Sequence, residues 1–260
     1  DGIVEKEEVS LEEACRKYLS LYSEKELKSK YTFSMNLPHL IDALQDTIRY
    51  GNIKLKNYKK VYSDEDVIQF SVVTLVLPDG SLVLSFSGTD GSITGWKENL
   101  MMTYSKDLPC QILAKDYVKE TIADIPETSY LFGLKKKKVY PKMYLTGHSK
   151  GGNLAMYAYL KNPKLQGYIE GVKSFDGPGF ADGFWQGDED VSKITNYIPK
   201  DSIVGRALDH REQTKVLEAQ GSGLVQHDTL MWSVDVKDFN YCDALTKESD
   251  DLLEYVNKLL

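Results

Sequence analysis

The chain has 260 residues, of which 42% are hydrophobic and 27% are charged, and these proportions are typical of a globular protein. Its formal net charge of −7 argues against nucleic acid as the main partner, because phosphate binding requires a basic surface. The three cysteines lack the spacing of a disulfide framework, which indicates free thiols in a reducing compartment.

Neither a signal peptide nor a membrane-spanning segment is evident in the sequence. A spanning helix needs roughly 18 or more consecutive apolar residues, and no stretch approaches that length. We therefore expect a cytoplasmic protein, with the removal of a signal segment left open because the chain starts at Asp1. The sequence does not indicate an oligomeric state.

The first 50 residues predict helices that pack on a later sheet. Ser10 followed by Glu13 is typical of a helix-capping box. Residues 36–50 have a second amphipathic helical pattern, and Gly51 ends it.

Sheet signals begin at residue 67. Residues 67–77 and 82–86 are rich in β-branched and apolar side chains, and Asp79-Gly80 between them predicts an antiparallel hairpin. A further helix is expected from about Pro109 to Ile125. The four lysines at 135–138 predict a solvated surface turn; the alternative is a contact with an anionic substrate or with membrane headgroups.

Residues 143–161 have the pattern of a nucleophile elbow. The sequence Gly147-His148-Ser149-Lys150-Gly151 is G-x-S-x-G, and it lies between an apolar strand (143–146) and a helix-forming run (153–161). Such a turn strains its serine by about 1–3 kcal/mol and leaves no room for a Cβ at the two flanking glycines. The alternative is a glycine-rich helix entry.

Three more strands are predicted after the elbow, at residues 171–175, 194–198 and 214–219. Strands that alternate with helices indicate a mostly parallel sheet flanked by helices. The predicted fold is therefore α/β, in a single domain of residues 1–260. Residues 177–193 are expected to form a lid or a plain loop.

A serine nucleophile needs a general base and an acid that orients it, and in α/β-hydrolases these follow in the order Ser, Asp or Glu, His. Only His210 and His227 follow Ser149, and His227 is favoured because it lies in a loop after the last predicted strand. Asp201 directly follows the strand at 194–198 and is the favoured acid. Asp176, which also ends a strand, is its competitor.

The oxyanion of an acyl-transfer intermediate needs N–H donors. We expect one from the backbone of Lys150, which follows the nucleophile, and a second from Thr89 in the loop after an early strand. The Thr89 hydroxyl is a candidate third donor. The four histidines have no metal-ligand spacing, and no glycine-rich nucleotide loop follows a strand, so neither a metal nor a cofactor is expected.

The chain resembles the class 3 lipases, a branch of the α/β-hydrolases, at residues 86–90 with Trp96, at 146–152, at 196–201 and at Gln226-His227 with Trp232. More of the chain, roughly residues 31–240, resembles a bacterial family of lipase-like proteins called Mbeg-like, whose function is not settled. The resemblance implies the α/β-hydrolase fold and a serine hydrolase of unknown substrate. The likeness to the Mbeg-like family rests on Gln69-Phe70, Gly88-Thr89-Asp90, Gly95-Trp96-Lys97, residues 147–155, 176–180 and 202–205, and Gln226-His227.

Two departures from the resembling proteins concern the site. Lipases usually have Arg where Ser87 stands, and Mbeg-like proteins often lack an acid at the position of Asp201. The leading hypothesis is an enzyme that cleaves small-molecule acyl esters through Ser149, His227 and Asp201. The alternatives are a non-catalytic binding protein with the same fold, and a thioesterase or acyltransferase.

Overall fold

The computed structural model describes residues 2–4, 8–23, 25–26, 37–130, 135–247, 249–251 and 254. The strands are β1 (Val9–Ser10), β2 (Lys54–Ser63), β3 (Ile68–Val76), β4 (Leu82–Phe86), β5 (Glu127–Tyr130), β6 (Lys135–Lys138), β7 (Met143–His148), β8 (Ile169–Phe175), β9 (Ile194–Pro199) and β10 (Gln213–Leu217). The α-helices are α1 (Leu11–Leu21), α3 (Leu37–Leu44), α4 (Ile93–Met101), α5 (Pro109–Ala123) and α6 (Lys150–Leu160). The described part of the chain also contains short 3₁₀ helices, η1 (Pro163–Tyr168), η2 (Val204–Arg206), η3 (Gly223–His227) and η4 (Thr229–Met231).

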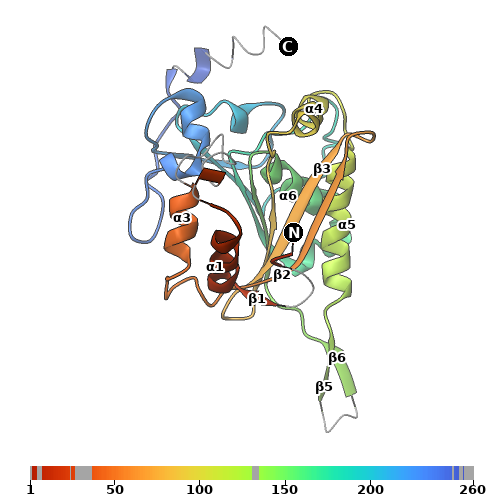
Figure 1. Ribbon diagram of the computed structural model, residues 1–260. Helices are drawn as coiled ribbons and strands as arrows, with labels where there is room; N and C mark the ends of the chain where they lie inside the picture. Colours follow the sequence, from red (N-terminus) through yellow and green to blue (C-terminus); the bar gives the residue numbers. More distant parts are fainter. Residues whose placement is uncertain are drawn as a thin grey trace.

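Eight strands form one mixed sheet in the order β1-β2-β3-β4-β7-β8-β9-β10 (Figure 1). The strands from β1 to β4 pair antiparallel, whereas β4, β7, β8, β9 and β10 pair parallel. Parallel neighbours need long crossover connections, and α5 and α6 supply two of them. The predicted sheet, mostly parallel and flanked by helices, is confirmed.

The predicted hairpin is confirmed as β3 and β4. Gly80 has a φ of +82°, which a residue without a Cβ adopts readily, and its N–H donates to the carbonyl of Leu77 at 2.9 Å. The carboxylate of Asp79 accepts from the N–H of Ser81 at 3.0 Å. The Asp-Gly pair therefore forms the turn for which its chemistry is suited.

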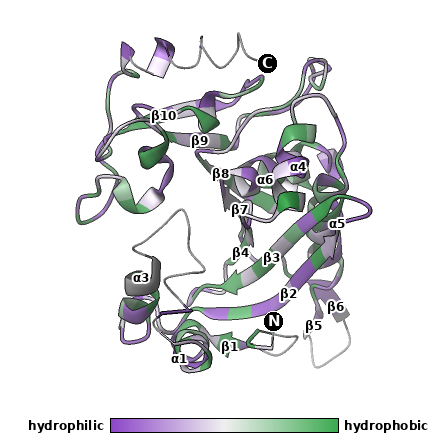
Figure 2. Cartoon of the chain, turned by 45° about the horizontal axis from the view of Figure 1, so that its top comes forward, coloured by the Kyte–Doolittle hydropathy of each residue, from purple (hydrophilic) through white to green (hydrophobic). Residues whose placement is uncertain are grey.

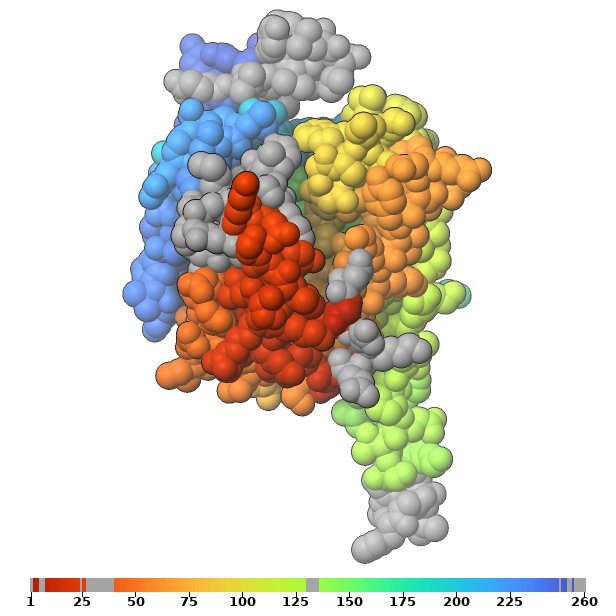
Figure 3. Space-filling view, in the orientation of Figure 1, coloured from red at the N-terminus to blue at the C-terminus, as the bar shows by residue number. Residues whose placement is uncertain are grey.

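Two lysine-rich strands were not predicted. Figure 2 shows β2 with mostly hydrophilic residues beside the more apolar β3, and β2 keeps its lysines near water in ion pairs such as Lys59 with Glu120. Residues 135–138, predicted as a surface turn, instead form β6, because their backbone pairs with β5. The β5–β6 hairpin projects beyond the body (Figures 1 and 3). Its residues Lys136 and Lys137 are exposed. An anion contact there stays a prediction.

Within the described residues of the N-terminal region, α1 and α3 pack against each other. The hydroxyl of Ser10 accepts from the N–H of Glu13 at 3.1 Å, as the predicted cap requires. None of the described helices has the length and apolar character that crossing a membrane requires.

The core lies around α6, in which every residue is buried. Helices α5 and α6 pack side by side on the sheet. Residues 181–193 form an irregular loop, and its Phe184 and Trp185 are buried against Phe180, with the two phenyl rings stacked at 3.9 Å. This packing holds the loop against the body of the domain, and a lid role for residues 177–193 stays a prediction.

Backbone segments approach closely where β7 turns into α6. A Cβ on Gly151 would lie 2.2 Å from the carbonyl oxygen of Phe86, and a Cβ on Gly147 would lie 2.2 Å from the carbonyl carbon of Gly151. Real Cβ atoms do not approach backbone so closely, so both glycines are required for the corner to form, as the sequence predicted.

Replacing Gly151 by alanine is expected to lower the free energy of unfolding by about 3 kcal/mol or more, because β4 or α6 must move to admit the methyl group. Gly167→Ala is the control, since nothing lies within 4 Å of its added Cβ, and it is expected to change stability by less than about 0.5 kcal/mol. Urea unfolding measures both variants. Equal midpoints for the two would contradict the close contact.

Candidate active site

Ser149 stands between β7 and α6 in a strained backbone conformation. Its φ is +57° and its ψ is −130°, values that residues with side chains rarely adopt. The turn is held by hydrogen bonds from the N–H of Ser149 to the carbonyl of Phe175 and from Gly152 to the carbonyl of Ser149, each at 2.9 Å. The side chain is partly exposed. Ser149 therefore has the geometry of a nucleophile elbow.

His227, at the end of η3, is paired with Asp176. Its Nδ1 lies 2.7 Å from Oδ2 of Asp176, whose side chain is 1% exposed, whereas that of His227 is 20% exposed. An ionised carboxylate only accepts, so Nδ1 carries the proton of this bond. Nε2 is then the ring nitrogen left to serve a nucleophile.

The other oxygen of Asp176 is held by the loop that follows β9. Oδ1 accepts from the hydroxyl of Ser202 at 2.5 Å and from the N–H of Gly205 at 3.0 Å. A Cβ on Gly205 would lie 2.3 Å from that oxygen, so only glycine admits the carboxylate here. Asp176 itself has a φ of +50°. Both carboxylate oxygens therefore have fixed partners, which orients the group toward His227.

The expected contact between Asp201 and His227 is wrong. The Asp201 carboxylate accepts from Nε2 of Gln226 at 2.8 Å and from the hydroxyl of Thr246. Asp201 follows β9, one strand farther from β7 than Asp176, which follows β8. It thus holds the residue before His227 and leaves the imidazole to Asp176.

His210, the competing base, has both ring nitrogens engaged away from Ser149. Nδ1 lies 2.6 Å from Glu212, and Nε2 lies 3.0 Å from the carbonyl oxygen of Ala207. Burial opposes ionisation of Glu212, but the hydrogen bond and charge of His210 outweigh it and lower the pKa of the carboxyl. His210 therefore belongs to a separate polar pair.

His148 supports the backbone of His227, a role that the sequence did not indicate beyond packing. Its Nε2 lies 2.7 Å from the carbonyl oxygen of His227 and must donate to it, and the ring centroids are 4.5 Å apart. Burial, and then the neighbouring imidazole of His227, lower the pKa of His148 to about 4. His148 is therefore neutral near pH 7.

The loop after β4 passes directly beside the elbow. A Cβ on Gly88 would lie 2.9 Å from the carbonyl oxygen of His148 and 3.4 Å from the Cβ of Ser149. The hydroxyl of Thr89 donates to Oδ1 of Asn99 in α4 at 2.9 Å. The single proton of the hydroxyl is used in this bond. The prediction that the hydroxyl is a third oxyanion donor is therefore wrong, and the backbone N–H of Thr89 remains the candidate second donor.

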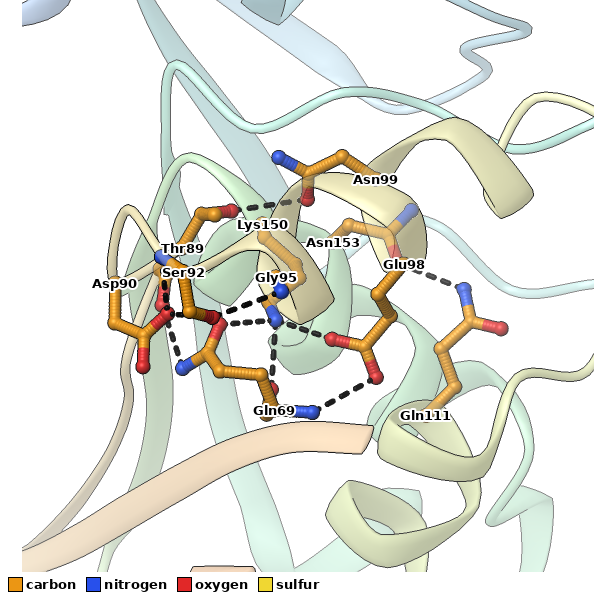
Figure 4. Close-up of polar contacts among 11 residues, drawn as sticks. Gln69, Thr89, Asp90, Ser92, Gly95, Glu98, Asn99, Gln111, Lys150 and Asn153 are labelled. Carbon is orange, nitrogen blue, oxygen red and sulfur yellow. Dashed lines mark hydrogen bonds and ion pairs between the residues drawn. The ribbon is translucent and has the colours of Figure 1, made fainter. Parts of the chain in front are cut away.

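The side chain of Lys150 is buried and charged, which the sequence did not indicate. Its backbone begins α6 directly after Ser149, as predicted, but its side chain is 1% exposed and forms an ion pair with Glu98, which is fully buried. Nζ also donates to Gln69, in β3 (Figure 4). Glu98 lies in α4, 52 residues from Lys150, and no local pattern pairs the two.

Taken together, the mixed sheet, the strained serine after β7 and the Asp–His pair at the ends of later elements define an α/β-hydrolase fold. The chain belongs to the Mbeg1-like family, whose model matches residues 44–260. No curated protein sequence matches the chain.

Two solved structures of lipases are similar to this chain. For M37 lipase the identity is 19%, over 71% of this chain and 70% of that chain, with a TM-score of 0.36. For the lipase from Rhizopus microsporus var. chinensis the identity is 12%, over 95% of this chain and 85% of that chain, with a TM-score of 0.47.

The low pKa of His148 predicts a pH-dependent stability. The folded protein keeps His148 neutral down to about pH 4, whereas an unfolded chain takes up the proton below its ordinary pKa of 6.5. The contribution of His148 to the free energy of unfolding is therefore fully present above pH 6.5. It is lost as the pH falls to about 4, which lowers the stability by up to about 3 kcal/mol. In His148→Asn, urea unfolding should show a correspondingly smaller decline. Identical slopes in both proteins would contradict the assignment.

Proposed function

We propose that this protein is a serine hydrolase that cleaves carboxylic esters through an acyl-enzyme. The observation that carries the proposal is the hydrogen bond between Nδ1 of His227 and the buried carboxylate of Asp176. The Asp176 end of this pair adjoins the elbow, because the N–H of Ser149, a residue held at positive φ, donates to the carbonyl of Phe175. The resemblance of the elbow and oxyanion loop to class 3 lipases supports esters as the substrate class.

In the proposed reaction, Oγ of Ser149 attacks the ester carbonyl while Nε2 of His227 takes the hydroxyl proton. Asp176 holds the imidazole in the tautomer with a proton on Nδ1 and stabilises the imidazolium that forms. The imidazolium then gives its Nε2 proton to the departing alkoxide, and an alcohol leaves. Water attacks the acyl-enzyme by the same route, which releases the acid and restores the serine.

The negative charge of each tetrahedral intermediate needs donors on one side of the reacting carbon. The backbone N–H of Lys150, at the start of α6, is the proposed first donor, and the helix N-terminus favours negative charge. The N–H of Thr89 is the proposed second donor, in the loop that passes the Cβ of Ser149. Both are backbone groups, so they need no side-chain rearrangement during the reaction.

The nucleophile is tested with a fluorophosphonate probe, which phosphonylates activated serines. We expect the wild-type protein to be labelled and Ser149→Ala not to be labelled. Ser192→Ala changes an exposed serine in the loop before β9 and should label like the wild type. Equal labelling of Ser149→Ala would exclude Ser149 as the nucleophile, and an unlabelled wild type would favour a non-catalytic binding protein.

The acid is tested by comparing two isosteric changes. Asp176→Asn is expected to lower kcat for a p-nitrophenyl ester on the order of 10⁴-fold, because an amide no longer fixes the imidazole tautomer. Asp201→Asn is expected to lower kcat less than about 10-fold, since it alters the contacts with Gln226 and Thr246 but not the contact of His227 with Asp176. The opposite ranking would return Asp201 to the role of the acid. Parallel assays with thioesters distinguish a thioesterase.

A further inference from the structure

The buried ammonium of Lys150 has three hydrogen-bond acceptors, which matches its three protons. Nζ lies 2.6 Å from the carbonyl oxygen of Gln69, 2.6 Å from Oε1 of the same residue, and in contact with Oε2 of Glu98 (Figure 4). These contacts join β3, α4 and the start of α6 at one point.

Stability alone does not explain this arrangement. Lys150 and Glu98 are at most 1% exposed, and removing two charges from water costs free energy that their attraction repays only in part. An apolar pair of similar volume often stabilises a fold as well or better. The ion pair therefore calls for a role besides stability.

Lys150 determines which way the side-chain amide of Gln69 faces. Because Oε1 accepts from the ammonium, Nε2 must lie on the other side of the amide, where it donates to the carbonyl oxygen of Gly88 at 3.4 Å. The reverse orientation would place the NH₂ group against the ammonium and an oxygen against the carbonyl of Gly88, and both contacts would be repulsive.

The carbonyl of Gly88 belongs to the peptide group that carries the N–H of Thr89. In a trans peptide the C=O and N–H point in opposite directions, so holding the carbonyl toward Gln69 turns the N–H away from Gln69. If this peptide rotated by half a turn, an oxygen would replace the donor. Asn99 fixes the side chain of Thr89 independently. Rotation of the Gly88–Thr89 peptide plane is therefore the movement that Gln69 has to prevent.

We propose that Gln69, oriented by Lys150 and Glu98, is a positioning residue that sets the Gly88–Thr89 peptide so that its N–H serves the oxyanion. The proposal rests on the proposed function, in which Thr89 is an oxyanion donor. It explains why a charged side chain from the residue after the nucleophile is buried beside the loop that completes the site.

The test replaces Gln69 by leucine, which has a similar volume but cannot hold the carbonyl of Gly88. We expect kcat for a p-nitrophenyl ester to fall about 10²–10³-fold with KM changed less than about 3-fold, because the oxyanion exists only in the transition state and intermediates. A trifluoromethyl ketone, which forms an oxyanion with the serine, should lose affinity by a similar factor. Lys150→Met should behave alike, since it frees the Gln69 amide.

Thr74→Val is the matched control, because it removes a buried hydrogen bond (Thr74 to Tyr117, 2.7 Å) from the same strand β3 but away from the loop. It should lower the unfolding temperature without changing kcat. If Gln69→Leu and Thr74→Val lose equal stability and Gln69→Leu keeps the wild-type kcat, the positioning role is excluded.

A crystal structure of Gln69→Leu separates this inference from the proposed function. We expect the Gly88–Thr89 peptide to be rotated relative to the wild type, whether or not the protein hydrolyses esters. A peptide in the wild-type orientation would overturn the inference. A rotated peptide in a protein whose wild type shows no esterase activity or probe labelling would instead overturn the proposed function alone.

Discussion

The contact between the backbone of Gly151 and the carbonyl oxygen of Phe86 is the constraint on which the site depends. It places the start of α6 directly on the end of β4, with no side chain between them. The chain can reach that position only through a sharp turn at Ser149, so the positive φ of the serine follows from the packing. The same contact brings Gly88, two residues beyond Phe86, beside the Cβ of Ser149. One close approach thus positions both the proposed nucleophile and the loop proposed to hold the oxyanion.

Local sequence patterns predict the parts of this arrangement that depend on short-range chemistry. The elbow glycines and the Asp79-Gly80 turn each follow from the backbone conformation that their positions demand. The choice between Asp176 and Asp201 depends instead on how two loops turn after neighbouring parallel strands. Gln226 and His227 are adjacent, yet the side chain of one meets Asp201 and the side chain of the other meets Asp176. No spacing in the sequence distinguishes these outcomes, although the DGPG run at 176–179 marks a segment that must pass close to other backbone.

Lysines show why charge is an unreliable guide to position in this protein. In β2 and β6 they belong to strands while the backbone pairs: carboxylates such as Glu8 and Glu120 accommodate lysine charges in β2, and solvent accommodates those of Lys136 and Lys137 in β6. Lys150 is the opposite case, a lysine at the start of the core helix whose charge is met entirely by buried groups. Glu98, which neutralises this charge, lies on α4 and comes near Lys150 only because the chain folds. Sequence reasoning assigns Lys150 a backbone role and gives no reason to look at its side chain.

Two residues with side chains adopt positive φ at neighbouring strand ends, Ser149 after β7 and Asp176 after β8. Each of these backbone conformations costs of order 1–3 kcal/mol, so it persists only where several surrounding contacts hold it. For Asp176 those surroundings are Ser202, Gly205, His227 and the backbone of β9. For Ser149 they are the close packing of Gly151 on Phe86. The packing therefore fixes both strained residues, and the proposed function gives that fixed geometry a use, because it keeps a serine and the carboxylate partner of His227 at the same edge of the sheet.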